Sequence, residues 1–209
     1  MSLYYLIIAL MGYLFGCSNL AFFLGKARGF DIRAHGSNNA GASNATVTMG
    51  LKIGVIVALH DILKSFVAAF LAALLFPAVS AAAAVAGAAA VLGHIFPFYL
   101  RFQGGKGFAS FLGLTLALDW RFFLAIILVI ALITIISDYI SLATLTTITA
   151  FPLYLMVRHA SILVIGIVCV ASVVMVFKHL VNIKRLITGE EIGLRRAMSK
   201  EDKITQQYQ

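Results

Sequence analysis

The stretch that decides the fold is residues 121–137, RFFLAIILVIALITIIS, whose single charge is at the first position. A run of this length and apolarity is typical of a helix that crosses a hydrocarbon core about 30 Å thick. Six further apolar segments can be drawn, near residues 3–24, 53–76, 78–100, 107–119, 139–157 and 160–177. None has the alternating pattern of a membrane β-strand. The sequence therefore predicts an all-α polytopic membrane protein, a seven-transmembrane-helix bundle.

The composition excludes a soluble globular domain. Of the 209 residues, 62% are hydrophobic and 11% are charged, whereas soluble domains are about half apolar and about a quarter charged. Segment 107–119 is too short to cross the bilayer alone, so we expect it to begin inside the protein, below a glycine-rich loop, unless the fold thins the membrane locally. We predict one transmembrane domain over residues 1–189 and a charged, polar tail over residues 190–209.

The distribution of Lys and Arg predicts the orientation. With the N-terminus outside, thirteen of the sixteen basic residues fall on the inner face, Arg121 and Arg158 on the outer face, and Lys64 within a span. This asymmetry follows the positive-inside rule and puts the C-terminus in the cytoplasm. It also accounts for most of the net charge of +8. Because the basic residues form no continuous stripe interleaved with aromatics, nucleic acid is not an expected partner.

Three polar segments interrupt the apolar chain, and the predicted topology brings all three to the inner face. The first is GSNNAGASN, residues 36–44. Its Ser37, Asn39, Ser43 and Asn44 supply uncharged hydrogen-bond donors and acceptors that suit a phosphate or hydroxyl ligand. The alternative is a re-entrant turn in which these side chains satisfy backbone groups near the membrane.

The second polar segment is Gly104-Gly105-Lys106-Gly107, directly before an apolar run. Backbone amides at a helix start carry partial positive charge, and glycine lets a phosphate approach the backbone. Lys106 adds a full positive charge. The glycine spacing is not that of a Walker A loop, and the alternative is a basic turn at the inner face.

The third polar segment, residues 178–185, contains His179, Asn182 and Arg185 at intervals of three. This spacing places the three side chains on one arc of a helix end. Histidine can act as a base or hydrogen-bonding clamp, and arginine binds phosphate with two hydrogen bonds. The alternative is snorkelling at the interface, which explains the lysines of the segment better than His179 and Asn182.

Two features inside the apolar segments are candidates for supporting roles. Asp61 and Lys64 lie three residues apart, and ionisable residues inside a membrane are costly and are usually paired. They predict a structural ion pair, with support of the phosphate site by Lys64 as the alternative. His94 is interpreted as a structural hydrogen-bonding residue. The two cysteines and five histidines lack the spacing of metal ligands, so neither a metal nor a cofactor is predicted.

Together these motifs resemble the bacterial membrane family of acyl-phosphate:glycerol-3-phosphate acyltransferases over nearly the whole chain. The residues that carry the resemblance are Gly36, Ser37, Asn39, Gly41, Ala42, Ser43, Asn44, Asp61, Lys64, Gly93, His94, Pro97, Gly104, Gly105, Lys106, Gly107, His179, Asn182, Ile183, Arg185, Leu186, Gly189 and Glu191. The resemblance implies seven spans in the bacterial cytoplasmic (inner) membrane, with the active site at the cytoplasmic face. It also implies transfer of a fatty acyl group from acyl phosphate to the sn-1 hydroxyl of glycerol 3-phosphate, which yields lysophosphatidic acid and phosphate.

The resemblance also suggests roles for the residues and the partners. We expect catalytic roles for Ser37, Lys106, His179 and Asn182, substrate binding by Asn39, Ser43, Asn44, Gly104, Gly105, Gly107 and Arg185, and supporting roles for Lys64, His94 and Glu191. Our hypothesis is that Lys106 and the amides of the three glycines hold the donor phosphate. The expected partners are acyl phosphate, glycerol 3-phosphate and membrane lipid, with an upstream enzyme that forms acyl phosphate as a further candidate.

The chain departs from the family pattern at Val47, where the family usually has an arginine. A paralogue that acylates another acceptor is therefore an alternative. A non-enzymatic anion transporter or lipid-binding protein is another.

Overall fold

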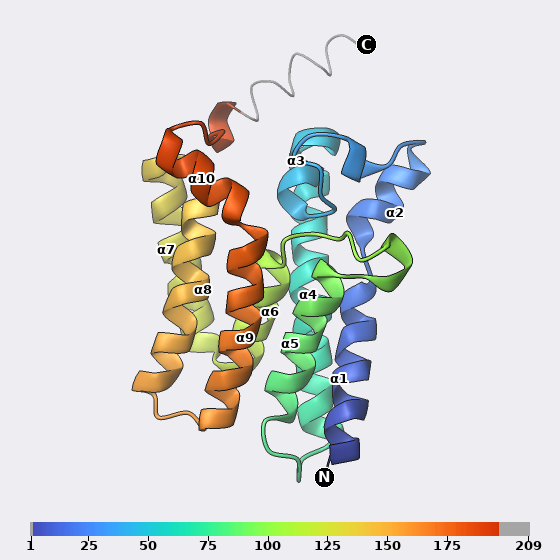
Figure 1. The fold of residues 1–209 in the computed structure, drawn as a ribbon, viewed down its shortest axis with the longest axis vertical. Helices are drawn as coiled ribbons and strands as arrows, with labels where there is room; N and C mark the ends of the chain where they lie inside the picture. The colour runs from blue at the N-terminus through green and yellow to red at the C-terminus, as the bar shows by residue number, and fades with distance from the viewer. Residues whose placement is uncertain (1, 197–209) are drawn as a thin grey trace.

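The computed structural model describes residues 2–196, and all the regular structure in that range is helical (Figure 1). In chain order the elements are α1 (Ser2–Cys17), α2 (Leu20–Ala27), η1 (Ile32–Ala34), α3 (Ala42–Met49), α4 (Leu51–Leu75), α5 (Ala82–Ile95), η2 (Phe98–Leu100), α6 (Phe108–Leu118), α7 (Trp120–Ser137), α8 (Ile140–Val157), α9 (Ile162–Lys178) and α10 (Leu180–Thr188). The predicted all-α class is confirmed.

The prediction of seven spans holds only in part. Five segments of the described chain are long and apolar enough to cross a membrane, namely Ser2–Ala27, Leu51–Leu75, Ala82–Leu100, Trp120–Ser137 and Ile140–Val157. A sixth is obtained if α9 and α10, which meet at a bend of 55°, count as one broken span. The remaining apolar helix, α6, has 11 residues and rises only about 16 Å, about half the hydrocarbon thickness.

The connections of the bundle sort to two ends. In Figure 1, the N-terminus and the α4–α5, α6–α7 and α8–α9 connections lie at the lower end, whereas α3 and α10 lie at the upper end. The α5–α6 connection, which contains the glycine-rich loop, turns back below the level of α3 and α10. Because α5 and α6 are both short, with 14 and 11 residues, this loop is recessed into the bundle. Segment 107–119 thus begins inside the protein, as the sequence predicts.

Small residues let α1 and α5 approach closely. A β-carbon on Gly12 or Gly16 would overlap the backbone of Ala86 or Ala90, and one on Gly93 would overlap the backbone carbonyl of Tyr13. Without a hydrophobic driving force inside lipid, such close contact between small residues is a main source of helix association.

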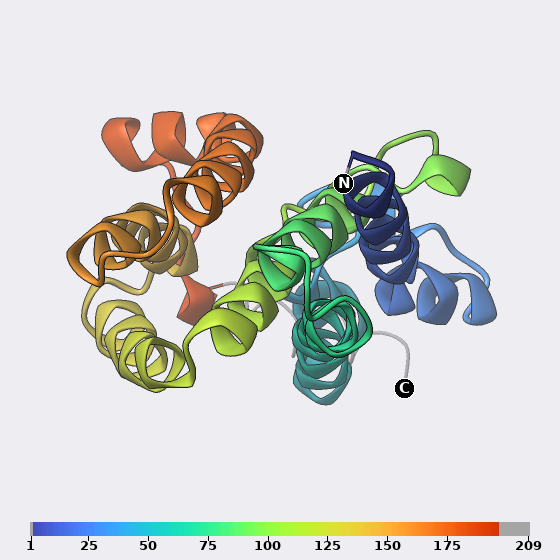
Figure 2. The same cartoon turned by 90° about the horizontal axis from the view of Figure 1, so that it is seen from below.

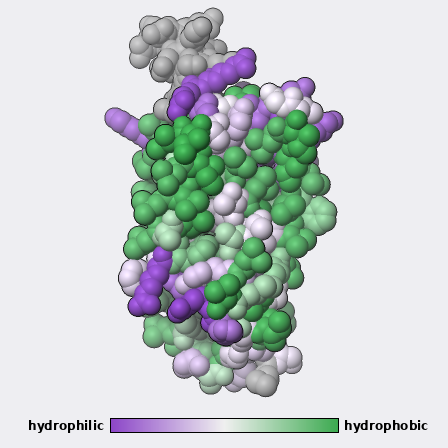
Figure 3. All heavy atoms as spheres, turned by 90° about the vertical axis from the view of Figure 1, so that its left-hand side faces the viewer, coloured by the Kyte–Doolittle hydropathy of each residue, from purple (hydrophilic) through white to green (hydrophobic). Residues whose placement is uncertain are grey.

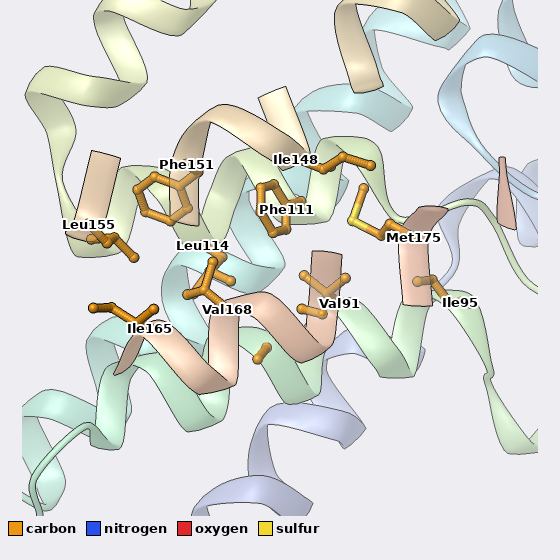
Figure 4. Packing of buried hydrophobic residues seen from close by; sticks show 12 residues of the cluster. Val91, Ile95, Phe111, Leu114, Ile148, Phe151, Leu155, Ile165, Val168 and Met175 are labelled. Carbon is orange, nitrogen blue, oxygen red and sulfur yellow. The ribbon is translucent and has the colours of Figure 1, made fainter. Parts of the chain in front are cut away.

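The central core joins the two sides of the bundle. Figure 2 shows α5 and α6 between the pair α1 and α4 and the group α7 to α9. The largest buried cluster comes from α5, α6, α8 and α9 (Figure 4). At its centre, Phe111 and Phe151 pack edge to face with ring centroids 5.9 Å apart. Outside this core, a broad apolar band covers the face shown in Figure 3, with hydrophilic atoms towards its ends, as expected for a surface in contact with lipid.

The first part of the predicted tail packs against the α7–α8 turn. The amide of Leu194 donates to the carbonyl of Asp138 (2.8 Å), and the amide of Arg195 donates to the Asp138 carboxylate (3.0 Å). The Arg195 guanidinium donates to the Ile135 carbonyl at 2.7 Å. Residues up to 196 are therefore attached to the bundle, and residues 197–209 lie outside the described part of the chain. The boundary of the transmembrane domain at residue 189 remains a prediction.

Replacing Gly16 by Val should destabilise the protein, because the new side chain would force α1 away from Ala90. Overpacking of this kind costs about 1–3 kcal/mol. The matched control is Gly166→Val on α9, where a β-carbon meets nothing within 4 Å. Thermal unfolding in detergent should show a lower Tm for Gly16→Val than for Gly166→Val. Equal Tm values would contradict close α1–α5 packing.

Candidate functional site

The first polar loop is organised around the buried side chain of Asn44. Its amide nitrogen donates to the carbonyls of Ile32 (3.0 Å), His35 (3.0 Å) and Asn39 (2.7 Å). Its amide oxygen accepts from the backbone N–H of Ser37 at 2.8 Å. Both ends of the side chain are thus occupied by the backbone of the loop. Asn44 therefore holds the shape of the first loop and has no donor left for a ligand. For this residue the structure agrees with the alternative interpretation, a re-entrant turn in which the side chain satisfies backbone groups.

The other polar side chains of the first loop are more accessible. Asn39 donates to the hydroxyl of Ser37 (2.8 Å) and accepts from the amide of Gly41 (3.1 Å). The side chains of Ser37 and Ser43 are exposed, and Ser43 lies in the first turn of α3. The side chains of Ser37 and Ser43 are therefore accessible from outside the loop, whereas Asn39 fixes the position of the Ser37 hydroxyl.

The glycine-rich loop folds against the end of α5. The amide of Gly104 donates to the carbonyl of Ile95 (3.0 Å), and that of Gly105 donates to the carbonyl of His94 (3.1 Å). A β-carbon at Gly104 or Gly105 would overlap the His94 carbonyl or imidazole. These two amides hold the loop in place. The amides of Lys106, Gly107 and Phe108 donate to no residue in the range 2–196, and Gly107 has a left-handed φ of +95° at the start of α6.

Direct contacts join the first loop to the second. The amide of Ala40 donates to the carbonyl of Gly104 at 3.2 Å, and the Arg33 guanidinium donates to the Leu100 carbonyl at 2.8 Å. Arg33 also pairs with Asp31 at 2.8 Å and lowers the pKa of that carboxyl group to about 2. Arg33 and Asp31 were not among the site residues predicted from the sequence. Their two-residue spacing in a polar loop is the signal that could have found them.

A chain of hydrogen bonds joins the second segment to the third. The ammonium group of Lys106 donates to the Asn182 amide oxygen at 2.5 Å, and the Asn182 amide nitrogen donates to Glu191 Oε1 at 2.8 Å. The other oxygen of Glu191 is buried and has no partner among the described residues. Lys106, Asn182 and Glu191 therefore form one linked set, although they are far apart in sequence.

The electrostatics at Lys106 suit an anion. Burial lowers the pKa of Lys106 from its usual 10.5, the charge of Glu191 opposes this shift, and the charge of Arg185 adds to it. Arg185 thus lies within electrostatic range of Lys106. An anionic ligand between these two cations would be held by both charges.

His179 lies at the bend between α9 and α10 and is buried. Its Nδ1 lies 2.8 Å from the carbonyl of Met175. A carbonyl only accepts, so Nδ1 carries the proton and Nε2 is the nitrogen left to accept one. His179 is close enough to Lys106 and Glu191 for their charges to interact, so the structure brings His179, Asn182 and Arg185 to the same end of the bundle as Lys106.

A buried ionic cluster lies under the glycine-rich loop. The ammonium group of Lys64 donates to the Asp61 carboxylate (2.7 Å), to His94 Nδ1 (2.8 Å) and to the backbone carbonyl of Ser18 (2.7 Å). The predicted pairing of Asp61 with Lys64 is confirmed. Because the His94 ring also contacts Gly105, the cluster supports the loop that carries Lys106. Among the described residues, no group of three or more His, Cys, Asp or Glu side chains could hold a metal ion.

Comparison with known proteins gives the class of this chain. The family model described as glycerol-3-phosphate acyltransferase matches residues 6–189. A match of this extent defines the class, and the chain belongs to the glycerol-3-phosphate acyltransferase family.

Named relatives cover nearly all of the chain. The glycerol-3-phosphate acyltransferase 1 of Oceanobacillus iheyensis is 35% identical over 209 residues, covering 95% of this chain and 99% of the relative. The glycerol-3-phosphate acyltransferase of Trichlorobacter lovleyi is 40% identical, covering 86% of this chain and 92% of the relative.

Solved structures have the same fold. The crystal structure of PlsY (YgiH), an integral membrane glycerol 3-phosphate acyltransferase, in its glycerol 3-phosphate form superposes with a TM-score of 0.85 at 35% identity. That match covers 90% of this chain and 94% of the other. The lysophosphatidic acid form superposes with a TM-score of 0.83 at 34% identity, covering 93% and 98% of the two chains. The chain is thus an integral membrane protein of this fold.

Replacing Asn44 by Asp should loosen the first loop, because a carboxylate cannot donate to the three carbonyls that Asn44 now satisfies. Each buried group left without a partner costs about 1–3 kcal/mol. Hydrogen exchange of residues 32–44 should become faster. The control is Asn38→Asp, an exposed side chain with one bond of 3.2 Å to the Arg33 carbonyl. Equal exchange in both variants would show that Asn44 does not hold the loop.

Proposed function

We propose that this protein transfers a fatty acyl group from acyl phosphate to the sn-1 hydroxyl of glycerol 3-phosphate, which yields lysophosphatidic acid and inorganic phosphate. The relatives named glycerol-3-phosphate acyltransferase support the reaction class, and the related crystal structures in glycerol 3-phosphate and lysophosphatidic acid forms support the acceptor and the product. The observation that carries the proposal is the Lys106–Asn182–Glu191 chain. It joins the glycine-rich loop to the third polar segment beside an apolar bundle.

The donor phosphate would bind at the start of α6. Lys106 supplies a positive charge there, and the amides of Lys106, Gly107 and Phe108 have no acceptor in the described chain. Because the amides of Gly104 and Gly105 donate to α5, the ligand-binding amides are those that follow them. Donors fixed before the reaction stabilise the charge that develops as phosphate leaves.

The acyl transfer would be direct. The sn-1 oxygen attacks the carbonyl carbon of acyl phosphate, a new ester C–O bond forms, and the C–O bond to phosphate breaks with its electron pair on the phosphate. The hydroxyl proton goes to a phosphate oxygen of the substrate or to His179 Nε2, the ring nitrogen that the Met175 contact leaves free. Ser37, Ser43 and Arg185 would orient the acceptor.

The protein would lie in the bacterial inner membrane with its N-terminus outside and the site at the cytoplasmic face. The excess of Lys and Arg in the connections supports this orientation. The acyl chain would enter laterally from the inner leaflet, with a gain of about 0.8 kcal/mol for each CH₂ that it buries. An upstream enzyme that forms acyl phosphate would deliver the donor.

The decisive experiment is an assay of purified protein with palmitoyl phosphate, with and without glycerol 3-phosphate. We expect phosphate release that depends on the acceptor and lysophosphatidic acid as the lipid product, both measured in the same sample, with mass spectrometry for the lipid. Such a result would also show that Val47 is tolerated. No acyl product with glycerol 3-phosphate would overturn the proposed acceptor. Other polyol phosphates would then be tested.

Lys106→Ala should lower turnover at least a hundredfold, because the variant loses the charge that holds the leaving phosphate, and loss of one such donor costs about 10²–10³ in rate. The control is Lys184→Ala, which removes an exposed charge from α10 two residues from Asn182, on the other side of the helix. Both variants should elute as monodisperse protein. Full activity of Lys106→Ala would remove Lys106 from the mechanism.

A further inference from the structure

A cluster of polar side chains outside the site described above lies at the break between α1 and α2. Between α1 and α2, residues 18 and 19 leave the helix, at the outer edge of the bundle and near the depth of the glycine-rich loop (Figure 1). A cavity of about 530 Å³ opens there between α1, α2 and α4. Most of its wall is apolar, and its polar lining residues are Ser18, His60 and Lys64. A cavity of this size can take part of a lipid chain.

Ser18, His60 and Asp61 are arranged like the nucleophile, the base and the orienting carboxylate of a serine hydrolase. Ser18 Oγ lies 3.0 Å from His60 Nε2, and His60 Nδ1 lies 3.4 Å from the Asp61 carboxylate. A carboxylate only accepts, so the geometry gives the proton to Nδ1 and leaves Nε2 to accept from the Ser18 hydroxyl. This is the arrangement by which a histidine activates a serine.

Two further features favour reaction at Ser18. The side chain of Ser18 is exposed to the cavity, and the backbone amide of Leu20, a residue that also lines the cavity, donates to no described residue. Amides at a helix start stabilise developing negative charge on a carbonyl oxygen. Lys64 fixes the backbone of the serine through its 2.7 Å bond to the Ser18 carbonyl and holds Asp61 at 2.7 Å. The nucleophile, its base and the acid are thus held by contacts from two helices.

From this arrangement we propose that Ser18 is a second reactive centre, a nucleophile for long-chain acyl groups carried on a good leaving group such as phosphate. Ser18 Oγ attacks the acyl carbonyl and its proton passes to His60 Nε2. The Oγ–C bond forms, and the bond from carbon to the leaving oxygen breaks with its electron pair on the phosphate, which takes the proton from His60. Water then attacks the serine ester, neutral His60 takes the proton of the water, and the serine oxygen leaves and recovers that proton from His60. The net reaction is hydrolysis of acyl phosphate to fatty acid and phosphate.

This activity is separate from the acyl transfer proposed above. Ser18 and His60 have no role in the mechanism proposed for that transfer. The two places are linked through the bond between Lys64 and His94 and through the Asn19 side chain, which donates to the Ala40 carbonyl of the first polar loop at 3.0 Å. The competing explanation is purely structural, in which the hydrogen bond between Ser18 and His60 fastens the break between α1 and α2. The two explanations differ in one property, the reactivity of the serine oxygen.

The test uses a fluorophosphonate with a long alkyl chain, which reacts with activated serines, on the intact purified protein. We expect one adduct, mapped to Ser18 by peptide mass spectrometry, which is lost in Ser18→Ala. His60→Gln should slow labelling at least about tenfold, because a general base contributes about 10²–10⁴ to such steps. Ser80→Ala, an exposed serine in the α4–α5 connection, is the matched control and should label normally. No adduct at Ser18, or equal labelling rates in wild type and His60→Gln, would overturn the proposal.

A second measurement follows turnover. With palmitoyl phosphate and no acceptor, slow phosphate release together with fatty acid should be present in wild type and absent in Ser18→Ala, while acceptor-dependent transfer is retained and shows that the variant is folded. Acceptor-independent release that is unchanged in Ser18→Ala would refute hydrolysis at this serine. Because the labelling needs no glycerol 3-phosphate, a failure of the proposed acyl transfer leaves the test of Ser18 intact.

Discussion

The ammonium group of Lys64 connects three parts of the bundle through hydrogen bonds. It bonds the Ser18 carbonyl at the break in the first span, Asp61 on its own helix, and His94 at the end of α5. A charge inside a membrane protein is costly unless it is paired. Removing one partner of a buried pair costs about 3–5 kcal/mol. The positions of the groups that bond Lys64 are therefore strongly constrained. Two of these groups lie where a helix ends: Ser18 directly after α1, and His94 in the last turn of α5.

The depth of the glycine-rich loop follows from this constraint. The His94 ring, fixed by Lys64, touches Gly105, and the carbonyls of His94 and Ile95 accept from the first two loop amides. Irregular backbone at membrane depth is tolerated where it lines a cavity and its polar groups are satisfied. The loop meets this condition with its first two amides, and the next amides, at the start of α6, have no acceptor among residues 2–196. The recess also desolvates Lys106, which strengthens its interaction with an anion.

The apolar pattern predicted the long helices well, because the thickness of the membrane sets their length and contacts with distant residues have little influence on it. Residues 53–76, 121–137 and 139–157 agree with α4, α7 and α8 to within two residues at each end. The break at Ser18 was not predicted within 3–24, since the two residues that leave the helix, Ser18 and Asn19, are neither glycine nor proline. It is fixed by the Asn19 side chain, which accepts from the Phe22 amide, and by Lys64, 46 residues away. The end of α5 at Ile95 is two residues before Pro97, a breaker that the sequence does show.

The site could be predicted as a set of residue types, whereas the division of labour within it could not. Asparagine serves equally well as a ligand-binding residue or as a bond to the backbone, and only the fold shows that Asn44 faces three carbonyls while Asn182 faces Lys106. The roles of the amides in the glycine-rich loop could not be predicted either. Whether each amide can bind a ligand depends on whether a carbonyl at the end of α5 already accepts its hydrogen bond.

The position of Lys106, the proposed catalytic lysine, also depends on the far end of the described chain. Asn182 is held between Lys106 and Glu191, and the segment after Glu191 is tied to Asp138 at the α7–α8 turn. Because α7 touches the first half of the bundle mainly through α6, the position of Glu191 depends on how α7 and α8 sit against that core. The aromatic contact of Phe111 with Phe151 therefore helps to align Asn182 with Lys106, although neither ring lies at the site. A substitution in that contact would act on the reaction through geometry, since it leaves the charges of the site unchanged.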